Sequence, residues 1–199
     1  MMINYFEKPT SPDCAESGSF SAFLKELVLP MLAPREREIV LDVFTLELEK
    51  WSMDQSILSN ALLNIKAILC AEQAQRLIEN QCEDFHNLHL ILDSDVKIIL
   101  TSWKWTSSQE TDWLINFNSD TEVHAVLLKT DPENRVIESG LSTFSHAVLS
   151  CFYEKTRIDN AIKHISDLFE VAPNEEAAII KATVEQIKEA VLAGILIIQ

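Results

Sequence analysis

Apolar residues in the N-terminal half of the chain recur at three- and four-residue spacing, which is the pattern of an amphipathic helix. The pattern runs through residues 19–29, 34–51 and 54–80. Residues 1–17 are polar and contain two prolines, so we expect a flexible arm there. The sequence therefore predicts a helical N-terminal domain over residues 18–90.

The C-terminal half begins with strand patterns and ends with helical ones. Residues 122–137 hold two β-rich runs on either side of a turn-forming Asp-Pro-Glu-Asn, which predicts a hairpin. Helical stripes follow over residues 141–153, 157–169 and 174–193, and Gly194 is expected to end the last of them. The closing Ile-Leu-Ile-Ile-Gln is β-prone, and we expect it to pair with the hairpin.

Together these patterns predict a mostly helical α+β fold. An N-terminal α-bundle is followed by a small sheet and a winged-helix-like C-terminal unit over residues 91–199. A hairpin, three helices and a returning strand are the layout of such a unit.

The chain is strongly acidic, with a formal net charge of -15 from 31 acidic and 16 basic residues. Phosphate contacts supply most nucleic-acid affinity, so nucleic acid is not an expected partner and a basic peptide is favoured. The sequence has neither a signal-peptide pattern nor an uninterrupted apolar run of about 18 residues, which favours a cytoplasmic protein without membrane contact. Four scattered cysteines favour reduced thiols.

Candidate chemical groups are few. Only three glycines occur, which excludes glycine-rich phosphate loops. Cys82, His86 and His89 have spacings that permit a zinc site, but a fourth ligand is not evident and a packed helix end explains them as well. Ser145 and His146 are adjacent on one helix and point in different directions, so they do not form a hydrolase dyad. No metal, catalytic residue or stand-alone active site is predicted.

Two of the four tryptophans lie one residue apart, as Trp103 and Trp105 around Lys104. In an extended segment both would share one face, with the lysine opposite them. They are either a core pair or part of a docking surface, because tryptophan is common in both places. We expect one face to pack on the sheet and the other to contribute to a partner surface.

The order of these blocks resembles a known family. A helical half, a His-containing junction before LHLILDSD, a Trp-bearing segment, the strand pair HAVLLKTDPENRVIES, the run LSTFSHAVLSCFYEKTRIDNAIKHI and a last helix ending AGILI are similar to methanobactin biosynthesis subunits of the MbnC type. The wider kin is the HvfC-like, DNA-binding-type family, which usually has His-Pro at the junction where this chain has His86-Asn87-Leu88-His89. The C-terminal part also resembles PqqD-like peptide-recognition modules.

The resemblance implies an accessory role. Such a subunit forms a heterodimer with a TIM-barrel enzyme of the MbnB type, which holds the iron, while the small subunit itself has no cofactor. It holds the leader of a ribosomal precursor peptide of the MbnA type. The complex oxidises peptide cysteines to oxazolone and thioamide groups for copper chelation.

On this basis we expect a hairpin strand to accept the leader as an added strand. The predicted peptide-binding residues are Val123, His124, Ala125, Val126, Leu127, Leu128, Arg135, Val136 and Ile137. The predicted partner interface comprises Trp103, Lys104, Trp105, His86 and His89. Two alternatives stay open: an acidic adaptor or secretion chaperone, and a winged-helix transcriptional regulator.

Overall fold

A computed structural model describes residues 22–55, 85–102, 123–131, 133, 135–170 and 174–199, and six isolated positions between 65 and 75. The chain divides into two compact units, Met1–Phe44 and Thr45–Gln199. The division falls inside one long helix, α2, which runs from Pro34 to Gln55. The sequence correctly predicts that a helix begins at Pro34. The domain bounds proposed above stay a prediction.

Short helical turns precede α2 in the first unit. A π-helical turn, Leu24–Val28, leads into a 3-10 turn, Leu29–Met31, which contains Pro30 at its start. The entry to α2 is fixed by side chains: the Ala33 N–H donates to Glu36 Oε2 at 2.9 Å, and Arg37 Nε donates to the Leu32 carbonyl at 2.9 Å. These bonds satisfy backbone groups that a helix end leaves without partners.

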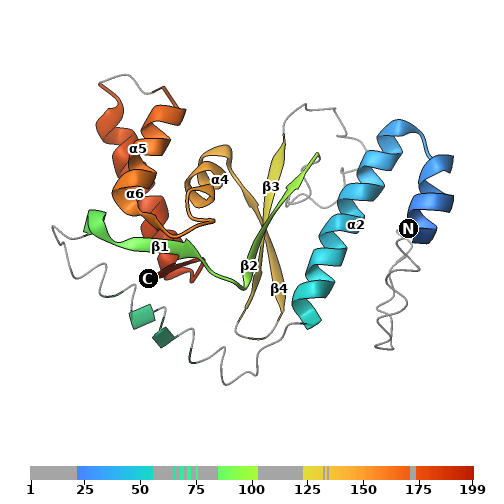
Figure 1. Cartoon of the computed structure of the whole chain (residues 1–199), viewed down its shortest axis with the longest axis horizontal. Coiled ribbons are helices and arrows are strands. Elements are labelled where there is room, and N and C mark those ends of the chain that lie inside the picture. Colours follow the sequence, from blue (N-terminus) through green and yellow to red (C-terminus); the bar gives the residue numbers. More distant parts are fainter. Residues whose placement is uncertain are drawn as a thin grey trace. The chain divides into compact units, whose positions relative to one another are not determined.

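The second unit has a mixed α+β fold, which confirms the predicted fold class (Figure 1). Its described strands form two antiparallel three-stranded sheets, in the orders β5-β1-β6 and β2-β3-β4. The strands are β1 His89–Leu92, β2 Val96–Thr101, β3 His124–Thr130, β4 Val136–Leu141, β5 Thr156–Arg157 and β6 Leu196–Ile198. A 3-10 turn, Phe85–Asn87, precedes β1.

The predicted hairpin and the three helices after it are confirmed. β3 pairs with β4 from Ala125 to Thr130, and β4 leads directly into the first of the helices (Figure 1). The helices are α4 Thr143–Ser150, α5 Ile158–Leu168 and α6 Glu176–Leu192. Ser142 caps α4 by accepting a bond from the Ser145 N–H at 3.0 Å. Gly194 follows α6 with φ 63°, a left-handed conformation that glycine adopts without a Cβ clash.

The predicted pairing of the C-terminal strand is wrong. β6 pairs with β1 and not with the hairpin. On one side of the hairpin the position is taken by β2, which pairs with β3 from His124 to Lys129. β6 instead lies beside β1, where Leu90 and Leu196 are both almost fully buried. Burial of these two leucines in the main core explains the choice.

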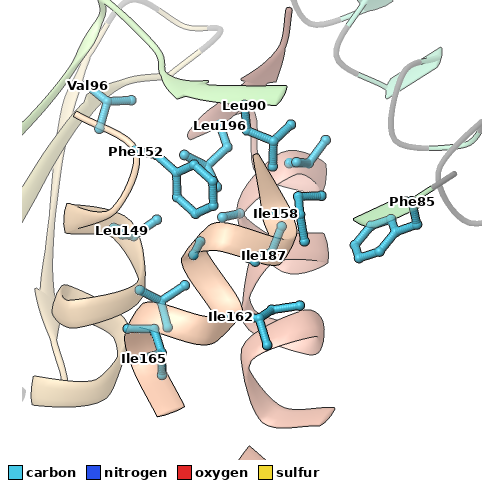
Figure 2. Close-up of a cluster of buried hydrophobic side chains, with 14 of the residues drawn as sticks. Phe85, Leu90, Val96, Leu149, Phe152, Ile158, Ile162, Ile165, Ile187 and Leu196 are labelled. Carbon is cyan, nitrogen blue, oxygen red and sulfur yellow. The ribbon is translucent and has the colours of Figure 1, made fainter. Parts of the chain in front are cut away.

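The main core joins sheet β5-β1-β6 to the three helices and to one face of the other sheet. Fully buried side chains come from each layer, and Figure 2 shows the ring of Phe152 inside this cluster, close to Leu196. The set includes Leu90, Leu149, Phe152, Ile158, Ile165, Ile187 and Leu196. Val96, Ile98 and Leu127 bring the hairpin sheet to the same cluster.

The opposite face of sheet β2-β3-β4 is covered by the C-terminal part of α2. Leu46 and Met53 pack against Val126 and Leu128 in a second, smaller cluster. Two ion pairs flank the contact. The Lys50 Nζ lies 2.5 Å from Glu138 Oε1 on β4, and the Lys97 Nζ on β2 lies 2.5 Å from Glu49 Oε2.

Candidate functional site

The two predicted peptide-binding segments differ in how accessible their backbones are. Val123 precedes β3, and residues 124–128 lie in that strand, which is the middle one of its sheet. Its backbone bonds go to β2 on one side and to β4 on the other. An added strand needs an unpaired edge. The prediction that β3 accepts a peptide strand is therefore wrong.

The second predicted segment, residues 135–137, opens the edge strand β4. The Asp131 N–H donates to the Arg135 carbonyl at 2.8 Å, so these two residues form a hydrogen-bonded pair. Bonded and non-bonded pairs alternate along an antiparallel ladder. From Ile137 on, every second residue of β4 therefore bonds to β3. The residues whose N–H and C=O groups face outward are Val136, Glu138 and Gly140.

This outer edge is open in the part of the chain that the structure describes, since no described strand pairs with it. β4 is exposed along its four middle residues. It has neither proline nor lysine, the residues that commonly protect sheet edges from pairing. The strand thus presents a row of backbone donors and acceptors of the kind that an extended peptide can bond.

The side chain of Glu138 carries the charge of this edge. Lys50 Nζ contacts Glu138 at 2.5 Å and Glu47 at 2.6 Å, so two carboxylates share one ammonium group. Burial lowers the pKa of Lys50, but its hydrogen bonds to the two glutamates outweigh burial, and the pKa is raised above 10.5. Two carboxylates and one ammonium give this cluster a formal charge of -1.

A buried aspartate fixes the turn that leads into β4. Asp131 Oδ1 accepts from the Arg135 backbone N–H at 2.8 Å, and its Oδ2 accepts from the guanidinium at 2.9 and 2.7 Å. The backbone N–H and then the guanidinium of Arg135 hold the pKa of Asp131 below its ordinary value, against the opposing effect of burial. Arg135 thus holds the turn, and its guanidinium is engaged by Asp131 and Glu133.

Of the predicted partner-interface residues, the structure describes His86 and His89. His86 is exposed on the turn before β1 and meets Phe85 edge-on, with 5.6 Å between ring centroids. His89 is half-buried in β1, opposite Arg157. Trp103, Lys104 and Trp105 lie outside the described residues, so their role stays a prediction.

The described residues form neither a metal-binding group nor a hydrolase dyad at the positions considered above. No group of three or more His, Cys, Asp or Glu side chains there is arranged to hold a metal ion. Cys82, of the possible zinc set, lies outside that part. The Ser145 hydroxyl donates to Gln186 Oε1 at 2.8 Å, which ties α4 to α6. No helix of the described residues has the length and apolar character that a membrane span requires.

Sequence reasoning named only the first two residues of β4 and missed Glu138, Gly140 and Lys50. A single glycine inside a β-prone run is a signal for close backbone approach, and it points to Gly140. The contact of Lys50 with Glu138 joins residues far apart in the chain, so no local pattern indicates it.

No known family model, curated protein or solved structure matches the chain.

Proposed function

We propose that the chain is the accessory subunit of a peptide-modifying iron enzyme, and that it holds a precursor peptide along the outer edge of β4. The open edge of β4 is the observation that carries the proposal. Following the resemblance in the sequence, the partner is a TIM-barrel iron oxidase of the MbnB type. The complex oxidises cysteines of an MbnA-type peptide to oxazolone and thioamide groups in the cytoplasm.

The edge offers affinity without requiring a particular peptide sequence. Outward N–H and C=O groups at Val136, Glu138 and Gly140 can each bond an antiparallel peptide backbone, and each such bond contributes about 0.5–1.5 kcal/mol. The hairpin is held rigid by Asp131 at one end and by α2 across its face. A rigid acceptor loses little entropy on binding, which favours peptide capture.

The element order of the second unit also supports this proposal. After the hairpin, three helices and a last strand follow in the order that the sequence predicted for this unit. The regulator alternative would require a basic helix for DNA. α5 has one lysine against two aspartates, and α6 has two lysines against three glutamates. Their acidic balance favours a peptide over DNA.

The test is purification of the tagged full-length protein from its native cells, with mass spectrometry of bound peptides and proteins and elemental analysis of iron. Wild-type protein should retain a precursor peptide and an iron-containing TIM-barrel enzyme in comparable amounts. In Gly140→Pro, an outward N–H is lost while the ladder to β3 stays intact. We expect this variant to retain about tenfold less peptide.

The matched control is Leu100→Pro. Residues of β3 bond alternately to β4 and to β2, and Ala125, which lies opposite Leu100, bonds to β4. The Leu100 N–H therefore points away from β3, to the outer edge of β2 at the opposite side of the same sheet. Leu100 is exposed, so little packing is lost. Peptide retention equal to wild type is expected in this variant. Equal peptide loss in both variants, or a metal-free preparation without the enzyme, would refute the proposal.

A further inference from the structure

The face of sheet β2-β3-β4 that α2 covers has two neighbouring rows of side chains that end at β4. In the first row, Ile99 pairs with Val126, and Val126 pairs with Gly140. Two β-branched side chains are thus followed by a position with none. Gly140 is exposed, so the space beside its Cα is open to a side chain from a neighbouring strand.

An edge glycine of this kind favours a large ring on the next strand. Opposite residues of neighbouring strands lie close enough for their side chains to touch, and a glycine leaves room for its partner to lean over the backbone. Aromatic residues placed across from glycine stabilise sheets in this way. A peptide paired with β4 would therefore gain most from an aromatic residue opposite Gly140.

The second row ends in a charge. Lys97 pairs with Leu128, and Leu128 pairs with Glu138. Lys97 has Glu49 as its ion-pair partner, whereas Glu138 shares Lys50 with Glu47. The three charged groups at the β4 end of this row thus include two carboxylates and one ammonium, which leaves an excess of negative charge beside Glu138. A basic side chain opposite Glu138 would complement it.

Glu138 and Gly140 are two residues apart and share one face, so the residues opposite them in an added strand are also two apart. We propose that β4 selects peptides with an aromatic and a basic residue separated by one residue, the aromatic opposite Gly140 and the basic residue opposite Glu138. This selection rests on the proposed function and adds the class of peptide that the edge accepts.

The probes are fluorescein-labelled synthetic peptides measured by fluorescence anisotropy. The reference peptide TVTFTKTV has Phe and Lys on one face of an extended strand. TVTFTTKV has the same composition but places them on opposite faces, and TVTFTETV reverses the charge. Cross-strand pairs contribute about 0.2–1 kcal/mol each. Wild-type protein should therefore bind the reference peptide about fivefold more tightly than either comparator.

Two protein variants separate the contributions of the two rows. Gly140→Val fills the space but keeps the outward N–H. It should weaken by about threefold the preference for the reference peptide over TVTATKTV, in which Ala replaces Phe. Glu138→Gln should remove the preference for Lys over Glu without changing that for Phe. Circular dichroism checks that each variant is folded.

The outcomes distinguish this selection from the proposed function. Equal affinity for all three peptides, together with weaker binding by Gly140→Pro, would overturn the selection and leave strand addition intact. Binding that Gly140→Pro does not affect would overturn both. Dimerisation of the wild-type protein that Gly140→Pro abolishes, seen by analytical ultracentrifugation without peptide binding, would assign the edge to a second copy and also overturn both.

Discussion

The two faces of sheet β2-β3-β4 are stabilised in different ways. One face joins a main core in which fifteen described residues are buried, and these come from both sheets and all three C-terminal helices. The other face meets α2 through four buried residues, with half-buried ion pairs beside them. Apolar burial dominates free energies of folding, whereas partly exposed ion pairs contribute little.

This difference between the two faces means that the residues that stabilise the fold are largely not those proposed to bind the peptide. The large core holds the hairpin to which β4 belongs. The outer-edge residues Val136 and Glu138 instead make contacts on the α2 side, through the smaller cluster and one ion pair. The charged side chains at that edge, Glu138 and its partner Lys50, lie on the α2 side of the sheet, beside the smaller cluster. Substitutions on the edge can therefore change what is bound while the core stays folded.

The largest effect is expected from loss of the central core ring. Phe152 is fully buried, and Phe152→Ala should lower the free energy of unfolding by about 3–5 kcal/mol. Urea unfolding followed by circular dichroism measures this change. The control, Tyr153→Ala, removes a neighbouring side chain that is 52% exposed and should change stability by less than about 0.5 kcal/mol. Similar losses in the two variants would contradict the assignment of the core.

A smaller and more local effect is expected under α2. Met53 is buried in the second cluster, and Met53→Ala should lower stability by about 2 kcal/mol. Hydrogen exchange should accelerate over residues 45–55 more than over α5, because the cluster is separate from the main core. Leu48→Ala, at an exposed position on the same helix, is the control. Uniform acceleration along the chain would show that the two clusters unfold as one.

The turn that Asp131 holds should make the folding stability depend on pH in the acidic range. The folded pKa of Asp131 lies below its ordinary value of 3.8, so its stabilisation is present above that value and is lost as the pH falls through the folded pKa. Urea midpoints of wild type and Asp131→Asn should differ at neutral pH and converge in strong acid. A difference that stays constant across this range would contradict the role of the carboxylate.

The smallest effect is expected from the ion pair between Lys50 and Glu138. A double-mutant cycle with Lys50→Gln and Glu138→Gln should give a coupling of about 0.2–1 kcal/mol that decreases in high salt. Because the pKa of Lys50 is raised above 10.5, its contribution is present below that pH and is lost as the pH rises through the folded pKa. Coupling that is insensitive to salt would contradict an electrostatic origin.

Local patterns predicted α2, the hairpin and the helices after it. Most of the helix predicted over residues 54–80 lies outside the described residues. The hairpin, its turn and the helices after it have clear periodicity, and Gly194 ends α6 as expected. Pairing between distant segments was not predictable in the same way. β5 has only two residues, and the pairing of β6 with β1 depends on the burial of Leu90 in the assembled core.

The candidate site was predicted only in part, for the same reason. Alternating apolar residues identified β3 as a strand, but they do not indicate whether a strand lies at the edge or in the middle of a sheet. Because β3 is paired with β2 as well as with β4, its backbone cannot accept a peptide strand. The ion pair of Glu138 with Lys50 joins two elements that are distant in the sequence, so only the folded chain reveals it.

The most direct test of the central claim is amide exchange by NMR on the protein with and without its co-purified peptide. If the peptide pairs with β4, the outward N–H groups of Glu138 and Gly140 should become protected, while that of Leu100 on the opposite edge should exchange as before. Protection at Leu100 alone, or unchanged exchange at both β4 positions with the peptide bound, would contradict the account.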